Sequence, residues 1–267
     1  MTKHIGDTQP LLAIMQKLRD PETGCPWDLA QSFKTIVPFT IEEAYEVADA
    51  IERMAMEELP DELGDLLFQV VFYCQLGKEQ GLFDFDTVVE RICNKLTRRH
   101  PHVFDGLKTS STAEIKQNWE QLKETERSER ELNSVLDDIP QSLPALSRSI
   151  KIQKRVARVG FDWAELEPVV AKIHEEIDEV LYEVKQESVD ENKVQDEMGD
   201  LLFAVVNLAR HLGVEPEQAL RQANHKFERR FRGVEAYAQA DGRLMTEHTL
   251  TELDGYWDKV KLDEANK

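Results

Sequence analysis

The sequence has few of the residues that interrupt helices or form cross-links. Its 267 residues include 12 glycines, 10 prolines and 3 cysteines. An all-β sandwich needs turn residues about every 8–12 positions, and this chain has too few of them for that class. The cysteines, Cys25, Cys74 and Cys93, are odd in number and form no C-x-x-C pair. The sequence therefore supports neither a disulfide framework nor a zinc knuckle.

Positive charge and long apolar runs are also scarce. Lys and Arg number 33 against 52 Asp and Glu, which gives a net charge of −19. A surface this acidic repels phosphate backbones and anionic lipids, so we expect no nucleic-acid polymer and no membrane as a partner. The longest apolar runs, near 66–76 and 201–209, are too short and too interrupted to span a bilayer. Residues 1–7 lack the apolar region of a signal peptide, and we expect a cytoplasmic protein.

The composition and the periodicity of the sequence are those of helices. Hydrophobic residues make up 41% of the chain and charged residues 32%, and no segment shows convincing strand alternation. Thr40, with Glu43 three residues later, has the spacing of a capping box and predicts a helix start. We therefore predict an all-α fold with helices near 8–20, 40–57, 60–80, 86–100, 145–158, 167–187, 190–212, 216–239 and 246–263.

Four segments of the chain occur twice, in the same order and at a nearly constant offset. Glu62–Val71 recurs as Glu197–Val206, Glu42–Val47 as Glu175–Val180, Lys95–His100 as Lys226–Phe231, and Trp119 is matched by Trp257. Such self-similarity indicates duplication. We interpret the chain as two tandem copies of one helical-bundle unit, at 1–125 and 145–267. The polar segment at 126–144, which contains two prolines, is predicted to be a linker.

Each copy carries two pairs of carboxylates on consecutive predicted helices. Residues three apart share a helix face, and the pairs are Glu43 with Glu46, Glu62 with Asp65, Glu176 with Glu179, and Glu197 with Asp200. An antiparallel hairpin would turn the two pairs of one copy toward each other.

The helices near 60–80 and 190–212 are apolar nearly all round, which predicts that they are buried. Buried carboxylates need a cationic side chain or a bound cation. Four converging carboxylates with oxygen ligands alone fit Mg²⁺ or Mn²⁺ best. Di-iron bundles also use inward-facing glutamates, but they need Glu-x-x-His, and none of the seven histidines has a Glu three residues before it.

Basic residues near the carboxylates distinguish the two copies. Lys172 lies one turn before Glu176, where the first copy has Phe39. A lysine beside a metal site can bind phosphate and a phenylalanine cannot. We therefore predict that the second copy is catalytic and that the first is weakened or regulatory. Lys226, Arg229 and Arg230 could offset phosphate charge or pair with surface glutamates such as Glu228, and Trp257 could stack on a base or pack in a core.

The sequence Glu-Glu-x-x-Glu followed by Glu-x-x-Asp resembles the signature of the all-α nucleoside triphosphate pyrophosphohydrolases. The tandem arrangement is similar to that of the bacterial MazG family, as are the segments 24–28, 99–104, 159–163 and 226–231. The resemblance implies hydrolysis of NTPs and dNTPs, ATP among them, to the monophosphate and pyrophosphate. It also implies Mg²⁺ dependence, for which Mn²⁺ can substitute, broad base tolerance and a homodimer.

The same resemblance, together with the spacing, assigns candidate site residues. The predicted metal ligands are Glu176, Glu179, Glu197 and Asp200, of which Glu176, Glu197 and Asp200 are also predicted to be catalytic. The predicted substrate-binding residues are Lys172, Glu175, Lys226, Arg229, Arg230 and Trp257. A possible second metal site comprises Glu43, Glu46, Glu62 and Asp65.

Two other functions remain open from the residues alone. The acidic clusters could belong to a helical regulatory protein that senses metal or nucleotide without turnover. A different phosphohydrolase could release orthophosphate from the γ position. The absence of Gly-x-x-x-x-Gly-Lys-Ser/Thr from the sequence argues against the commonest class of ATPases.

Overall fold

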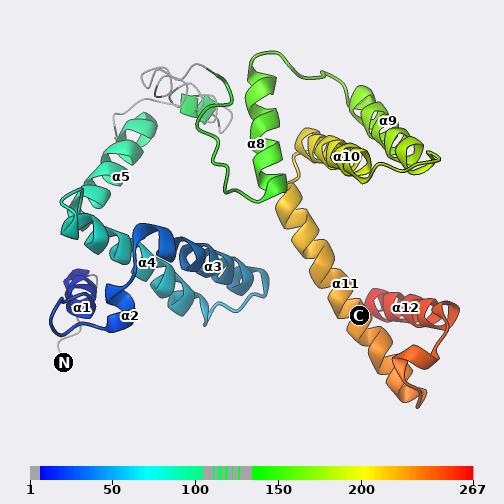
Figure 1. Ribbon diagram of the computed structural model, residues 1–267, viewed down its shortest axis with the longest axis horizontal. Helices are drawn as coiled ribbons and strands as arrows, with labels where there is room; N and C mark the ends of the chain where they lie inside the picture. The colour runs from blue at the N-terminus through cyan, green and yellow to red at the C-terminus, as the bar shows by residue number, and fades with distance from the viewer. Residues whose placement is uncertain are drawn as a thin grey trace. The chain divides into compact units, whose positions relative to one another are not determined.

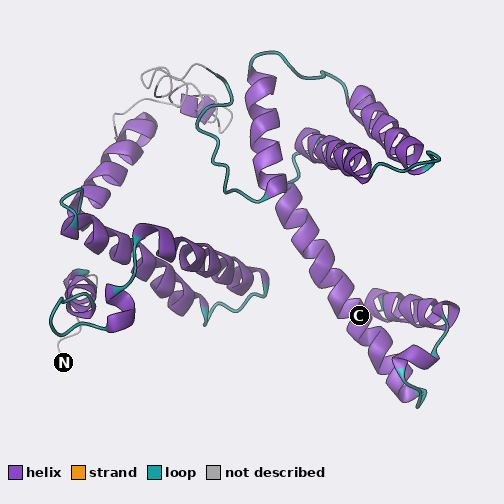
Figure 2. Ribbon diagram, viewed as in Figure 1, coloured by secondary structure: helices purple, strands orange, loops and turns teal. Residues whose placement is uncertain are grey.

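The computed structural model describes residues 7–104 and 134–266, together with residues 111, 114, 115, 118, 119, 122 and 126. In this part of the chain every regular element is a helix, which confirms the predicted all-α fold (Figures 1 and 2). The chain divides into two compact units, Met1–Thr125 and Glu126–Lys267. Residues 134–144, within the predicted linker, form turns and bends. Residues 127–133 of that linker lie outside the described residues.

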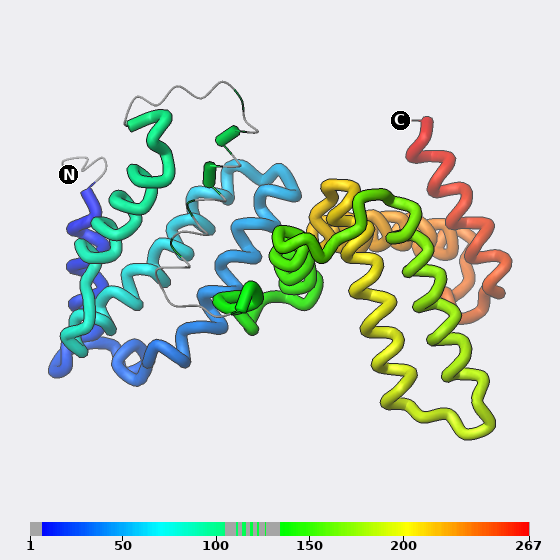
Figure 3. The backbone as a smooth tube through the Cα atoms, turned by 90° about the horizontal axis from the view of Figure 1, so that it is seen from above, coloured from blue at the N-terminus to red at the C-terminus, as the bar shows by residue number. Residues whose placement is uncertain are grey.

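The first unit is built around a helical hairpin. Its helices are α1 (Gln9–Leu18), α2 (Pro26–Leu29), α3 (Phe33–Glu52), α4 (Leu59–Glu79), α5 (Phe85–Arg99) and α6 (Pro101–Phe104). Helices α3 and α4 lie side by side, and α1 packs against α4 (Figure 3). The core of the unit is a cluster of fully buried apolar side chains from these three helices: Met15, Ile36, Val71, Phe72 and Leu76.

The predicted helix start at Thr40 is wrong. Helix α3 begins at Phe33, because the Ser32 side chain accepts a hydrogen bond from the Thr35 backbone N–H at 3.3 Å. Thr40 lies inside the helix, where its hydroxyl donates to the Ile36 carbonyl at 3.2 Å. Pro38 removes one backbone donor from the helix. The capping box and the burial of Ile36 outweigh this loss, and neither is visible in the local spacing around Thr40.

The second unit contains a similar hairpin. Its helices are α8 (Ala145–Arg158), α9 (Leu166–Val184), α10 (Glu191–His211), α11 (Pro216–Ala240), the short 3₁₀ helix η1 (Met245–Glu247) and α12 (Leu250–Ala265). Helices α9 and α10 lie side by side, α8 packs against α10 and α11, and α12 packs against α11 (Figures 1 and 3). The hairpin places the carboxylates of α9 opposite those of α10.

The prediction that α4 and α10 are buried on nearly all sides is wrong. Each helix buries one side only: Leu67 of α4 is 40% exposed and Leu202 of α10 is 52% exposed. Asp65 and Asp200 are exposed as well, so their carboxylates are not taken out of water within the chain. The reason is geometric, because two paired helices have one shared inner face and their outer faces need another surface.

Among the described residues, every helix is either too short or too polar to cross a lipid bilayer.

Candidate active site

Three carboxylates of the second hairpin converge. One oxygen each of Glu176 and Glu179 on α9 and of Glu197 on α10 lie within 4.8 Å of one another. Glu176 is only 3% exposed, and its Oε2 atom has no hydrogen-bond partner. A buried carboxylate oxygen without a partner is costly, so this oxygen is an available ligand or proton acceptor.

The carboxylates of the cluster repel one another electrostatically. Desolvation raises the pKa of the Glu179 carboxyl, and the neighbouring charges of Glu176 and Glu197 raise it further. Like charges held this close disfavour ionisation. A bound cation would remove that penalty.

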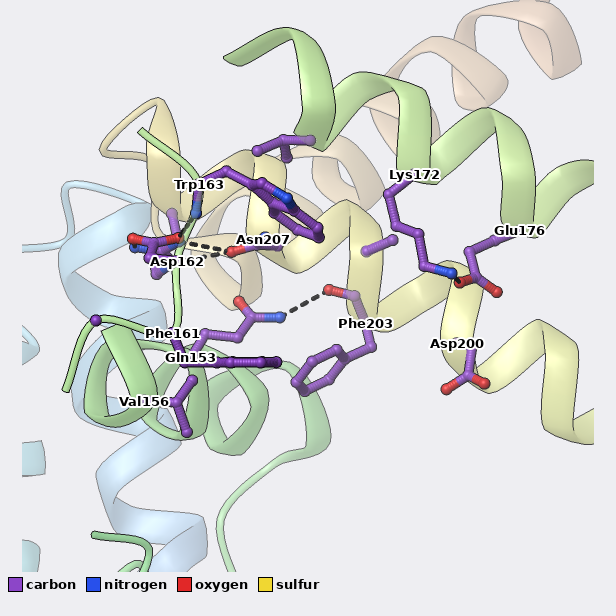
Figure 4. Close-up of a pocket in the computed structure, with 14 residues that line it drawn as sticks. Gln153, Val156, Phe161, Asp162, Trp163, Lys172, Glu176, Asp200, Phe203 and Asn207 are labelled. Carbon is purple, nitrogen blue, oxygen red and sulfur yellow. Dashed lines mark hydrogen bonds and ion pairs between the residues drawn. The ribbon is translucent and has the colours of Figure 1, made fainter. Parts of the chain in front are cut away.

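Lys172 supplies one positive charge beside the cluster. Its Nζ lies 2.6 Å from Oε1 of Glu176 and 3.0 Å from Oε1 of Glu175. The two carboxylates raise the pKa of the Lys172 ammonium, Glu176 contributing most. Lys172 is therefore charged at neutral pH. It occupies one oxygen of Glu176 and leaves the other available (Figure 4).

Asp200 is not one of the three converging carboxylates, but it lies near them. It shares the lining of one cavity with Lys172 and Glu176, and Figure 4 shows it on α10 close to both. The spacing of Glu197 and Asp200 along α10 thus places both carboxylates at this end of the hairpin.

The donor set fits a hard divalent cation. Every candidate ligand is a carboxylate oxygen, which is the ligand type that Mg²⁺ and Mn²⁺ prefer. The unpartnered Oε2 of Glu176 is the observation that favours a ligand here over a set of solvated acidic side chains.

The first hairpin has a comparable acidic cluster without the lysine. Oxygens of Glu43, Glu62 and Asp65 lie within 4.8 Å of one another. Desolvation raises the pKa of Glu43 and of Glu62, and in each case the neighbouring Glu46 raises it further. Phe39, at the position of Lys172, packs edge-on against Trp27 with ring centroids 5.6 Å apart.

A cavity of about 630 Å³ extends from Lys172, Glu176 and Asp200 along the second hairpin (Figure 4). The lining also includes residues of α8, of the loop that follows it and of α10, which are Gln153, Phe161, Asp162, Trp163, Asn207 and Arg210. Sequence reasoning missed these residues as part of a site. A signal was present, since Asp200, Phe203, Asn207 and Arg210 follow one another at helical spacing on one face of α10.

Five predicted substrate-binding residues lie outside the lining of this cavity. Glu175 contacts Lys172, and the other four lie on α11 and α12. Lys226, Arg229 and Arg230 are on α11, and Trp257 is on α12. Arg229 and Arg230 both pair with Glu264, at 2.9 and 2.8 Å. The Trp257 ring lies 5.2 Å from that of Phe227. The roles of these four residues toward substrate stay a prediction.

Both hairpins match one known protein family. The MazG nucleotide pyrophosphohydrolase domain matches the chain twice, at residues 31–104 and 165–234. The chain belongs to the MazG family. The two MazG matches contain all of α3 and α4 and all of α9 and α10, so both carboxylate clusters lie within the family's domain. Helices α8 and α12 lie outside the matches.

Individual relatives match nearly the whole chain. A protein of Escherichia coli strain K12 named nucleoside triphosphate pyrophosphohydrolase is 57% identical over 96% of this chain and 97% of its own length. A Thermotoga maritima protein named nucleoside triphosphate pyrophosphohydrolase/pyrophosphatase MazG is 41% identical over 95% of each chain. An uncharacterised Bacillus subtilis protein, YabN, is 40% identical over 94% of this chain and 51% of its own length.

Proposed function

We propose that the second unit hydrolyses nucleoside and deoxynucleoside triphosphates, ATP among them, to the monophosphate and pyrophosphate, in a reaction that depends on Mg²⁺. Two relatives that match nearly end to end are named for this activity. The observation that carries the proposal for this chain is the buried, unpartnered Oε2 of Glu176 beside Glu179, Glu197 and a charged lysine.

The residues that would hold the cation are Glu176, Glu179, Glu197 and Asp200. When bound, Mg²⁺, or Mn²⁺ in its place, supplies positive charge to the triphosphate oxygens and lowers the pKa of water. Glu176, Glu197 and Asp200 are the proposed catalytic residues. Glu176 is also proposed to accept the proton of the attacking water. Its Oε1 pairs with Lys172, so Oε2 is the oxygen that can contact either the cation or the water.

Lys172 is the proposed phosphate-binding group nearest to the cluster. Its ammonium contacts Glu175 and Glu176 and can add a phosphate oxygen to these contacts, because an ammonium has three donors. Glu175 then keeps the lysine in place. Positive charge held where negative charge develops in the transition state speeds phosphoryl transfer. Lys226, Arg229 and Arg230 are proposed to neutralise the rest of the triphosphate.

Broad base tolerance is proposed because the aromatic side chains near the site can stack on any base. Two aromatic groups qualify. Trp257 lies on α12 next to Phe227, and Phe161 with Trp163 lines the cavity. Stacking needs only a flat ring, so neither group would select one base strongly.

Product analysis tests the proposal. The purified protein is incubated with each nucleoside triphosphate and Mg²⁺, with and without a chelator, and the products are resolved by ion exchange. We expect monophosphate and pyrophosphate, lost with the chelator and in Glu197→Gln. The matched control is Glu62→Gln, the same change in the first unit, which should retain activity.

Other outcomes of this experiment contradict the proposal in different ways. Diphosphate and orthophosphate would indicate a phosphohydrolase that acts at the γ position. Activity that survives Glu197→Gln and disappears in Glu62→Gln would move turnover to the first unit. No turnover with any nucleotide would favour a helical protein that senses metal or nucleotide.

For the first unit we propose a weakened or regulatory role. Its cluster of Glu43, Glu62 and Asp65 could still hold a cation, with Glu46 nearby. Phe39 replaces the lysine that would hold phosphate. Equilibrium binding of Mn²⁺ to the full chain, compared with Glu62→Gln, tests this role. Unchanged Mn²⁺ binding in the variant would contradict it.

We also propose that the protein is a homodimer. Both helices of the second hairpin expose large apolar side chains, which include Ile177, Leu181, Met198, Leu202 and Val205, each between 39% and 52% exposed. A second copy would cover such a surface. Sedimentation equilibrium measures the mass, and a single-chain mass at micromolar concentration would contradict the proposal.

A further inference from the structure

We infer that the cavity of the second unit binds the nucleobase of the substrate and that Gln153 accepts a hydrogen bond from an N–H group of that base. The inference rests on the proposed function, since it places the base of the same nucleotide. It extends that function by choosing between the two aromatic groups and by naming a polar contact.

The position of the cavity suits a nucleotide. Lys172, Glu176 and Asp200, the proposed phosphate and metal residues, line one end, and Gln153 lines the other (Figure 4). The volume of about 630 Å³ falls within the range of about 300–1,000 Å³ typical of small-molecule pockets. A nucleotide with its phosphates at the first end would direct its base toward the second.

Gln153 presents an acceptor with a fixed orientation. The side chain is only 4% exposed, and its Nε2 donates to the Phe203 carbonyl at 2.8 Å. Its Oε1 is buried and has no partner. Rotating the amide by half a turn would break the bond to Phe203, so the group offered to a ligand is the carbonyl oxygen. An N–H of the ligand would satisfy it.

Asn207 presents the complementary donor. Its Oδ1 accepts hydrogen bonds from Nε and Nη2 of Arg210 at 3.0 and 2.8 Å, and Arg210 in turn donates to Asp162 at 2.9 Å. This chain of contacts fixes the amide and leaves Nδ2 as the donor. Each common base carries an N–H next to an acceptor on its Watson–Crick edge. An acceptor and a donor in one cavity therefore suit all of them.

Aromatic rings in the same cavity can hold the faces of the base. Phe161 and Trp163 are 80% and 43% exposed, although both are large apolar residues. Both lie in the loop after α8, outside the two MazG matches. Exposed rings beside a buried acceptor are suited to stacking a flat heterocycle.

The test compares substrates that differ in one N–H group. UTP has an N–H at N3 of its base, and N3-methyluridine triphosphate has none. We expect wild-type kcat/KM to favour UTP about tenfold. Without the N3–H group the buried Oε1 of Gln153 stays unpaired, and the loss of one such hydrogen bond corresponds to about a factor of ten. In Gln153→Met the preference should disappear. Gln218→Met, an exposed position on α11, is the matched control and should keep it.

A base-free substrate separates base binding from the chemistry. Ribose 5′-triphosphate should be hydrolysed equally well by the wild type and by Gln153→Met. Phe161→Ala, at an exposed position that should not affect folding, should raise KM for UTP and leave hydrolysis of ribose 5′-triphosphate unchanged. This second variant keeps the inference testable if Gln153→Met does not fold, which circular dichroism would reveal.

Different results would overturn the base site and the proposed function. Turnover of triphosphates to pyrophosphate with an unchanged UTP preference in Gln153→Met would overturn the inference alone. A rise in KM for UTP in Trp257→Leu, with none in Phe161→Ala, would place the base at α12 instead. If no triphosphate is turned over, calorimetric binding of UMP to the wild type and its loss in Gln153→Met would still support the cavity as a base site.

Discussion

The two halves of this protein build the same acidic hairpin and surround it differently. The first unit has Phe39 and Phe72 where the second has Lys172 and Asn207. Phe72 is 1% exposed and belongs to the core cluster of the first unit, whereas Lys172 and Asn207 line the cavity of the second.

The comparison separates scaffold from function. Both hairpins bring three carboxylates together, so convergence of acidic groups alone does not distinguish the two units. The second unit adds a lysine and a cavity whose lining includes Gln153 and Asn207. Phe72 in the first unit occupies the position of the cavity residue Asn207, and its buried ring contributes to stability. We therefore expect changes at matched positions to affect stability in the first unit and catalysis in the second.

The largest expected effect on stability is at Phe72. Truncation to alanine removes a fully buried aromatic side chain and leaves a void, so Phe72→Ala should lower the free energy of unfolding by about 3–5 kcal/mol. The matched change, Asn207→Ala, borders an existing cavity and should cost about 1–2 kcal/mol, the loss of the two hydrogen bonds from Arg210. Urea denaturation measures both. Equal costs would show that the two positions are packed alike.

The next effect is on catalysis, at Lys172. Lys172→Phe gives the second unit the residue of the first and removes the charge beside Glu176. We expect a loss of about 10²–10³ in kcat, the size found when one group that stabilises transition-state charge is removed. Phe39→Lys is the matched change in the first unit and should leave the rate unchanged. The double variant Phe39→Lys/Glu197→Gln has the lysine in the first unit and an inactivated second unit. More activity in it than in Glu197→Gln would show that the lysine alone accounts for the difference in activity between the units.

A smaller effect concerns one arginine–carboxylate ion pair in each unit, Arg19 with Glu79 and Arg210 with Asp162, and its pH dependence. Hydrogen bonds from Arg19 lower the pKa of Glu79 in the first unit, and hydrogen bonds from Arg210 lower the pKa of Asp162 in the second. A carboxyl with a lowered pKa stabilises the fold above its ordinary value, 4.5 for Glu79 and 3.8 for Asp162. That stability is lost as the pH falls through the folded-state pKa.

Neutral variants test this pH dependence. Glu79→Gln and Asp162→Asn should each lower the free energy of unfolding at pH 7 by about 1–2 kcal/mol, because both pairs are partly exposed. The difference from the wild type should shrink as the pH falls below 4. Denaturation at several pH values measures it, and a difference that stays constant down to pH 2 would exclude the linkage.

Much of the secondary structure could be predicted because its signals are local. The helix predicted near 190–212 spans Glu191–His211, and the one predicted near 60–80 spans Leu59–Glu79. The start predicted at Thr40 failed because a helix continues through Pro38 when a cap and core packing offset the lost hydrogen bond. Local spacing around Thr40 contains no information about the burial of Ile36.

The candidate site, like the secondary structure, could be predicted only in part. The spacing of Glu176, Glu179 and Glu197 predicted side chains that the hairpin does bring together. The spacing could not place Arg229 and Arg230, whose partner Glu264 comes from another helix. It also could not show the cavity, because a cavity is defined by what neighbouring helices leave unfilled.

The sequence by itself determined the duplication, the helices and the rows of carboxylates, because helix geometry converts spacing along the chain directly into position on a face. Only the tertiary structure decided which of those carboxylates is buried, that Gln153 has an unpartnered acceptor and that the second unit is hollow where Phe72 packs into the core of the first. These properties depend on packing between helices that are far apart in the sequence. The periodicity of one helix does not show which other helices pack against it.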